Sequence, residues 1–175
     1  MKRINVVGTS GSGKTTFAKT LASVLDYPYI EMDAEFWLPN WTQRSDADFF
    51  SRLEPKLAED TWVLDGNYSR TSPLKWQRAD TVIWLDMSRW RTHYRVIKRS
   101  MVRAATSQEL WSGNTESFRK SLLHKDSVIL WSITSYQTVK QRYASLMHDD
   151  EFKHLQFIRL QTPSQVARFI DQLKN

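Results

Sequence analysis

Residues 6–22 of the chain read VVGTSGSGKTTFAKTLA. A run of branched apolar residues leads into a loop of glycine and small hydroxyl residues, and apolar residues then recur at helical spacing. The loop, Gly8 to Thr15, matches the pattern G-x-x-x-x-G-K-[ST]. Its glycines allow the backbone to turn several N–H groups toward one anion. The stretch therefore predicts a phosphate-binding loop between a strand and a helix.

The residue types in this loop indicate a nucleoside triphosphate with Mg²⁺ as the ligand. Lys14 would neutralise the β and γ phosphates, and the Thr15 hydroxyl is placed to bind Mg²⁺. The start of the following helix adds unpaired N–H groups and the positive end of its dipole. An ordinary glycine-rich turn with a surface lysine is the alternative, and it requires a rare coincidence of residue types. The residues predicted to bind ATP are Gly8, Thr9, Ser10, Gly11, Ser12, Gly13, Lys14, Thr15 and Thr16.

The rest of the chain alternates short apolar segments with helical patterns. This alternation predicts an α/β protein in which a parallel sheet is covered by helices on both faces. Within the helix expected over residues 88–103, four apolar residues fall on one side, which we expect to pack in the core: Trp90, Tyr94, Ile97 and Met101. The segments that read as strands are 4–7, 29–32, 62–64, 81–85 and 155–160.

The second half of the chain carries weaker patterns. Residues 104–117 are small and polar, and they predict a mobile loop or lid. Residues 118–147 favour a helix, although 128–131 would also suit a strand. Thr162 and Pro163 predict the start of the last helix, with the threonine as N-cap and the proline in the first turn.

Three aspartates, Asp33, Asp65 and Asp86, follow predicted strands. Ligands of such sheets bind beyond the carboxyl ends of the strands. We expect Asp65 to lie on the metal side with Thr15, and Asp33 to orient or deprotonate an attacking hydroxyl. The two roles could be exchanged, and either aspartate could instead cap a turn. For Asp86, which precedes Ser88 and a helix, capping is the favoured reading.

Positive charge is concentrated in one segment. Residues 86–125 hold nine basic and three acidic residues, a difference that equals the net charge of +6 of the whole chain. Four arginines recur there every four residues: Arg91, Arg95, Arg99 and Arg103. Like charges at this helical spacing cost roughly 0.2–0.5 kcal/mol per pair, so an anion is the expected partner. We predict that Arg95 and Arg99 stabilise the charge of a transferred phosphoryl group, with a solvated basic face as the alternative.

The composition suits one globular domain. The chain has 175 residues, of which 41% are hydrophobic, enough to form a core of its own. The absence of cysteine excludes disulfides and thiol chemistry. The sequence has neither a secretory leader pattern nor an apolar run of membrane-spanning length. We therefore expect a cytoplasmic protein without a membrane segment, and the oligomeric state stays open.

Several motifs occur together and in order: the glycine-rich loop, MDAEFW at 32–37, DGNYS at 65–69 and RADTVIWLD at 78–86. With the arginine-rich helix that follows, this set resembles the small P-loop kinase-like proteins labelled DNA topology modulation (FlaR-related) proteins. Those proteins are similar in turn to adenylate kinases and shikimate kinases. The resemblance covers nearly the whole chain and is thinnest over residues 104–150.

The resemblance implies a P-loop NTPase of the nucleoside-monophosphate-kinase-like type, a three-layer α/β/α fold with a five-stranded parallel sheet. It implies one domain over residues 1–175, with a substrate-binding insertion near 34–60 and a lid near 95–125. It also implies that Asp33 faces the acceptor, that Arg95 and Arg99 are lid arginines, and that the base lies near Gln161-Thr162-Pro163. The arginine pair that adenylate kinases place around the monophosphate is not matched, and the possible substitutes are Arg44, Arg70 and Arg78.

Together these patterns predict an ATP-dependent phosphotransferase that uses Mg²⁺ and moves the γ-phosphoryl group to a nucleotide or another small acceptor. The acceptor itself and the preference for ATP over GTP stay open. Trp37, Trp41 and Tyr68 are candidates for lining its pocket, with core packing as the alternative. A nucleic-acid-binding ATPase or regulator is the second hypothesis, because the basic segment and the tryptophans would suit DNA. It is not favoured, since no DNA-reading motif accompanies them.

Overall fold

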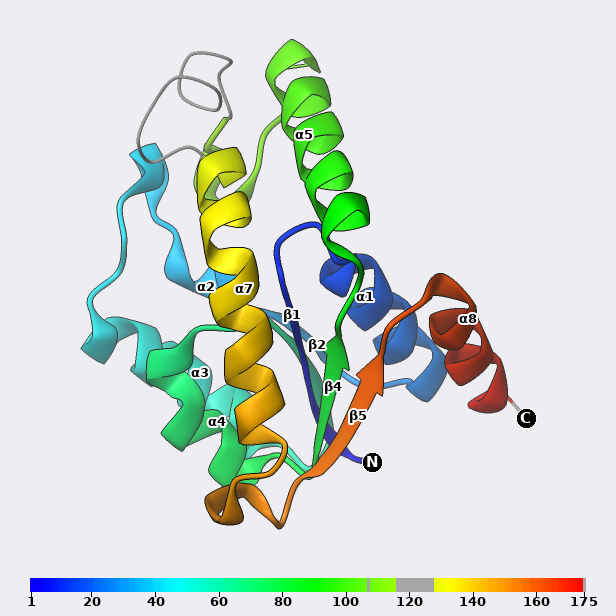
Figure 1. Cartoon of the computed structure of the whole chain (residues 1–175). Helices are drawn as coiled ribbons and strands as arrows, with labels where there is room; N and C mark the ends of the chain where they lie inside the picture. Colours follow the sequence, from blue (N-terminus) through cyan, green and yellow to red (C-terminus); the bar gives the residue numbers. More distant parts are fainter. Residues whose placement is uncertain (107, 116–127, 175) are drawn as a thin grey trace.

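The computed structural model describes residues 1–106, 108–115 and 128–174 (Figure 1). The basic residues Arg119, Lys120 and Lys125, and the parts of the predicted lid and helix that fall within 116–127, lie outside the described residues. The strands are β1 (Arg3–Gly8), β2 (Tyr29–Glu31), β3 (Trp62–Asp65), β4 (Thr81–Leu85) and β5 (Gln156–Leu160). The helices are α1 (Lys14–Leu25), α2 (Met32–Phe36), α3 (Asp46–Ala58), α4 (Ser72–Arg78), α5 (Arg89–Thr106), α7 (Val128–Leu146) and α8 (Pro163–Gln172).

The five strands form one parallel sheet in the order β2-β3-β1-β4-β5. The central strand β1 pairs with β3, for example Val6 with Asp65, and with β4, for example Gly8 with Leu85. The glycine-rich loop follows β1, where the strand order changes direction, and this is the point at which such sheets bind ligands. The predicted five-stranded parallel sheet is confirmed.

Alternate residues of each strand face opposite layers. Ile83 and Leu85 of β4 join a cluster with α1 and α8, whereas Val82 and Trp84 join a cluster with α3, α4 and α7. Both clusters are almost fully buried, and in Figure 1 the helices lie on both sides of the sheet. Strands that are apolar on both faces require such a double covering, which confirms the three-layer α/β/α architecture.

The prediction for the buried side of α5 is wrong. Trp90, Tyr94 and Met101 are 87%, 66% and 51% exposed, and Ile97 on the same stripe is 38% exposed. The residues that α5 buries are Thr92, Val96 and Ser100. The periodicity of a sequence identifies an apolar stripe on a helix, but it does not tell whether that stripe faces the core or the solvent. α5 projects past the end of the sheet (Figure 1), and among the described residues its small-residue side packs on the loop while the apolar stripe stays exposed.

Other local predictions have mixed outcomes. Residues 128–131 belong to α7 and are not a strand, and residues 104–106 extend α5 into the segment expected to be a loop. The cap of α8 is confirmed, because the Thr162 hydroxyl accepts a hydrogen bond from the Gln165 amide at 3.2 Å. Within the described part of the chain, none of the helices combines the length and apolar composition needed to cross a lipid bilayer.

Candidate active site

The glycine-rich loop follows β1 and bends over the start of α1. Gly8, Gly11 and Gly13 have φ values of 146°, 79° and 97°, which other residues rarely adopt. A Cβ on Gly8 would lie 2.6 Å from the Leu85 carbonyl oxygen, and one on Gly11 would lie 2.4 Å from that of Thr92. The glycines thus serve both the turn of the loop and its close approach to β4 and α5.

Inside the loop, the Lys14 ammonium group donates to the Thr9 carbonyl at 3.1 Å. Burial lowers the pKa of Lys14, while the nearby carboxylates of Asp65 and Asp33 oppose that shift. The hydroxyl oxygens of Thr9 and Ser12 are buried and have no hydrogen-bond partner among the described residues. A cradle lined by unpaired hydroxyls and a cation suits the phosphates of a nucleotide.

The side chain of Asn67 fixes the first glycine of the loop. Its Oδ1 accepts from the Gly8 amide at 3.0 Å, and its Nδ2 donates to the Gly8 carbonyl at 2.8 Å. Both backbone groups of Gly8 are therefore held by one amide from the turn after β3. The Tyr143 hydroxyl donates to the same Oδ1 at 3.2 Å, which ties α7 to this turn.

Asp33 lies in the first turn of α2, immediately after β2. The Tyr68 hydroxyl donates to its Oδ1 at 2.5 Å. Burial raises the pKa of Asp33, although the hydrogen bond from Tyr68 and the charge of Lys14 act in the opposite direction. A carboxylate whose proton affinity is raised in this way suits a group that accepts a proton from a hydroxyl.

Asp65 ends β3 and is 5% exposed. The Tyr29 hydroxyl donates to its Oδ2 at 3.3 Å, whereas Oδ1 is buried and has no partner among the described residues. An unpaired carboxylate oxygen beside a phosphate loop fits Mg²⁺. No group of three or more acidic, histidine or cysteine side chains that could hold a metal occurs in residues 1–106, 108–115 and 128–174. The site therefore fits a cation that takes its other ligands from phosphate and water, as Mg²⁺ commonly does.

Of the four arginines of α5 that recur every four residues, two reach the loop. Arg95 Nη1 lies 3.5 Å from the Ser12 carbonyl oxygen, and Arg99 Nη2 donates to the Ser10 hydroxyl at 3.2 Å. Arg91 is exposed and Arg103 is half-buried further along the helix. The spacing of four residues thus places Arg95 and Arg99 against the glycine-rich loop, where the charge of Arg99 contributes to the lowered pKa of Lys14.

Beside the loop is a cavity of about 400 Å³. Ser12 and Thr16 line it on the loop side, Arg95 on the α5 side, and Pro163 and Ala167 on the α8 side. A cavity that continues from a phosphate cradle between two helices suits the base and ribose of a nucleotide. The base position near Pro163 that the resemblance implies stays a prediction.

Asp86 does not serve as the expected cap. Its carboxylate accepts from Arg159 Nε at 3.0 Å and Nη2 at 2.5 Å, and from Gln161 Nε2 at 3.3 Å. Lys140 of α7 lies 3.7 Å from its other oxygen. Asp86 therefore joins β4 to β5, since a fully formed ion pair within the sheet outweighs a single bond at a helix end.

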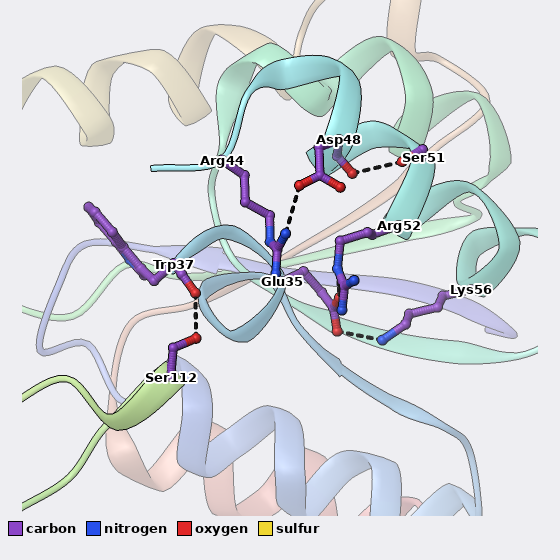
Figure 2. Close-up of polar contacts among 8 residues, drawn as sticks. All are labelled: Glu35, Trp37, Arg44, Asp48, Ser51, Arg52, Lys56 and Ser112. Atoms are coloured by element: carbon purple, nitrogen blue, oxygen red, sulfur yellow. Dashed lines mark hydrogen bonds and ion pairs between the residues drawn. The ribbon is translucent and has the colours of Figure 1, made fainter. Parts of the chain in front are cut away.

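The three possible substitutes for a monophosphate-binding arginine pair already have protein partners. Arg44 pairs with Asp48 at 2.6 Å, and Arg70 pairs with Asp46 at 2.8 Å. Arg78 donates to the carbonyl of Ala58, at the edge of the sheet where the strands begin and away from the loop. Figure 2 shows the first of these pairs beside Glu35, to which Arg52 and Lys56 donate. The bonds from Arg52 and Lys56 of α3 to Glu35 of α2 join these two helices.

The segment 108–115 is held against the turn after α2. Asn114 accepts from the Trp41 amide and donates to the Leu38 carbonyl, both at 2.8 Å. The Ser112 hydroxyl donates to the Trp37 carbonyl at 2.7 Å (Figure 2). The rings of Trp41 and Trp37 meet edge to face at 5.5 Å. Ser112 and Asn114 are therefore bonded to residues 37–41 in this structure, and the mobile loop or lid predicted for 104–117 stays a prediction.

The sequence patterns missed several residues of this region. Tyr68 was a candidate for the acceptor pocket, but its bond to Asp33 was not expected, and neither was the bond of Asn67 to Gly8; these bonds join segments 35 and 59 residues apart. No sequence pattern pointed to Asn114. A polar residue two positions after a strand-end aspartate, with a glycine between them, is the signal that would have drawn attention to Asn67.

The sheet order, the loop after the central strand and the flanking helices are those of the P-loop NTPase α/β fold. Shikimate kinase from Acinetobacter baumannii, solved in complex with shikimate, has a similar structure, with a TM-score of 0.60 and 14% identity over 99% of this chain and 90% of that one. A gluconokinase from Sinorhizobium meliloti 1021 is similar with a TM-score of 0.51 and 16% identity, over 98% of this chain and 95% of that one. Searches of protein-family models and of curated proteins find no match. At these identities the likeness establishes the fold.

Gly11→Ala is expected to lower the free energy of unfolding by roughly 2–4 kcal/mol, because the new Cβ meets the Thr92 carbonyl and the φ is positive. Gly113→Ala is the matched control, since its φ of 73° is similar but nothing lies within 4 Å of the new Cβ. It should lose only about 1 kcal/mol. Urea denaturation of the two variants measures the difference, and equal losses would contradict the close packing of α5 on the loop.

Asp33→Asn is expected to raise the melting temperature at pH 7–8 by roughly 2–4 °C. Because burial raises the pKa of Asp33, the folded protein binds this proton more tightly than the unfolded chain, and the ionised form is destabilising. The difference in melting temperature between Asp33→Asn and wild type should decrease as the pH falls through the pKa that Asp33 has in the folded protein. Asp60→Asn, at an exposed position, is the control. Calorimetry that finds the same gap at all pH values would refute the assignment.

Proposed function

We propose that the protein is an ATP-dependent phosphotransferase that transfers the γ-phosphoryl group to the hydroxyl of a small molecule. One observation carries the proposal: the loop with Lys14, Asp33 after β2 and Asp65 at the end of β3 lie at the same end of the parallel sheet, close enough that both carboxylates raise the pKa of Lys14. A phosphate-binding cation, a proton acceptor and a metal-side carboxylate thus share one end of the sheet. Phosphoryl transfer needs these three groups together.

In the proposed reaction the main-chain amides of residues 8–15 bind the phosphates, and Lys14 neutralises the β and γ groups. Arg95 and Arg99 stabilise the negative charge on the transferred group. Asp33 orients the acceptor hydroxyl and takes its proton, and Tyr68 holds the carboxylate in place. Thr15 and Asp65 would hold Mg²⁺, which when bound neutralises phosphate charge. The cavity between Arg95 and Pro163 takes the base and ribose.

A hydroxyl acceptor is favoured over a nucleoside monophosphate. The arginines available on the acceptor side, Arg44 and Arg70, are paired with Asp48 and Asp46, so their charge is already balanced. A monophosphate would have to compete with these two carboxylates for the guanidinium groups. The two proteins of similar structure are named for shikimate and gluconate, which are small hydroxylated acids. Membership of the DNA topology modulation (FlaR-related) group stays a prediction.

Isothermal titration calorimetry with Mg²⁺ tests the nucleotide site. Wild type is expected to bind ATP, and Lys14→Ala to bind it at least tenfold more weakly, since a buried charge partner of the phosphates is lost. Lys19→Ala, on the same helix with a side chain 58% exposed, is the control and should bind as wild type. A screen of hydroxylated acids, sugars and nucleosides for ADP release then identifies the acceptor, and Asp33→Asn should slow that release by about 10²-fold or more. Wild type that binds neither ATP nor GTP would refute the proposal.

The outer face of α5 favours a second candidate function, binding of nucleic acid. Trp90 and Tyr94 are largely exposed there, and Arg91 and Lys98 are exposed beside them. Aromatic faces next to cations suit stacked bases and phosphates. For this candidate, fluorescence anisotropy with a single-stranded oligonucleotide should show binding that weakens steeply with salt and falls about tenfold or more in Trp90→Ser. Binding that is absent at low salt would reject it.

A further inference from the structure

Lys75 of α4 is fully buried, yet it has no role in the site described above. Its relative exposure is 0%. Its ammonium group donates to the Asn67 carbonyl at 2.6 Å and lies 3.4 Å from the Gly66 carbonyl oxygen. No carboxylate pairs with it in the parts of the chain that the structure describes, and the nearest charge that affects it is the like charge of Arg142 on α7.

A buried cation without an acidic partner is destabilising. Burial lowers the pKa of Lys75 to about 7, so the folded state disfavours the charged form that water favours. Trp76 and Tyr143, both almost fully buried, lie close by, so the surroundings are largely apolar. A methionine or leucine would fill such a position at less cost in stability. The fold alone therefore does not account for a lysine here.

What the lysine holds is the backbone of the turn after β3. Gly66 and Asn67 follow Asp65 directly, and Asn5 of β1 donates to the same Gly66 carbonyl at 3.2 Å. The Asn67 carbonyl receives the ammonium group, while the Asn67 side chain binds both the N–H and the C=O of Gly8. Contacts therefore run without a break from Lys75 through Asn67 to the first residue of the phosphate loop.

We propose that Lys75 is a positioning residue of the phosphate-binding loop, acting through the backbone and side chain of Asn67. It fixes the turn so that the Asn67 amide holds Gly8 in its left-handed conformation, and so that Asp65 stays beside Lys14. The ligand concerned is the triphosphate group, and in this respect the inference rests on the proposed function. The contacts from Lys75 to Gly8 exist whether or not ATP is the ligand, and this allows the two to be tested apart.

The first test is spectroscopic and needs no nucleotide. In ¹⁵N–¹H correlation spectra, Lys75→Met should move the Gly8 amide and the Asn67 side-chain amide resonances, because both bonds depend on the turn. Asn67→Ala should move the Gly8 amide in the same direction. The Gly113 amide, which lies outside the chain of contacts, and the variant Lys153→Met, at an exposed lysine, are the controls. An unmoved Gly8 amide in Lys75→Met would overturn the proposal.

The second test measures ligand affinity. Lys75→Met should weaken ATP binding about tenfold and leave adenosine binding nearly unchanged, because the phosphates would lie against the main chain of the loop that Gly8 begins, whereas the base and ribose would lie in the cavity between Arg95 and Pro163. Lys75→Arg, which keeps a charged donor, should restore most of the affinity, and the effects of Lys75→Met and Asn67→Ala should not add. Equal losses for ATP and adenosine would indicate general damage and would overturn the proposal. If Lys75→Met does not fold, Lys75→Gln is measured in its place with the same criteria. If wild type binds no nucleotide, the proposed function fails while the Gly8 measurement still judges the role of Lys75.

Discussion

The backbone of α5 lies against Gly11 at a distance that no side chain at that position allows. The Thr92 carbonyl and the Val96 side chain occupy the space where a Cβ would stand. This approach sets the direction of α5, and with it the direction of every side chain on the helix. Arg95 and Arg99 fall on the loop side, whereas the apolar stripe from Trp90 to Met101 falls outside. The absence of a side chain at Gly11 thus allows the packing that brings Arg95 and Arg99 to the loop.

The parts of the fold that the sequence predicts correctly are those set by local patterns. Branched apolar runs fix the strands, and the loop between β1 and α1 is defined by consecutive glycines, a lysine and a threonine. The direction in which α5 faces is set by a contact with residue 11, about 80 positions away, and periodicity holds no information on it. The same holds for Asp86, whose partner Arg159 comes from the far end of the chain. Asn67 and Lys75 are beyond local patterns for the same reason.

The candidate site and its surroundings contain buried ionisable side chains that lower the stability of the folded protein. Burial lowers the pKa values of Lys14 and Lys75 and raises that of Asp33, so each of the three is destabilised in its charged form. All three lie near the end of the sheet where β1 and β3 finish. The stabilising parts are elsewhere, in the two apolar clusters that cover the faces of the sheet. This separation agrees with a site whose residues are selected for chemistry.

The separation of the buried charges from the apolar clusters also affects which part of the protein is expected to fluctuate. Opening of a structure on a local scale begins where buried apolar contact is sparse and unfavourable charge is dense. Here the buried charges lie at the rim formed by the glycine-rich loop and the turn that carries Asn67, while the interior of β1, β3 and β4 lies between two packed layers. We therefore expect the amide hydrogens of the rim to exchange with solvent faster than those of the layers beneath it. Ordering of this rim by a bound anion would appear as slower exchange there and nowhere else in the sheet.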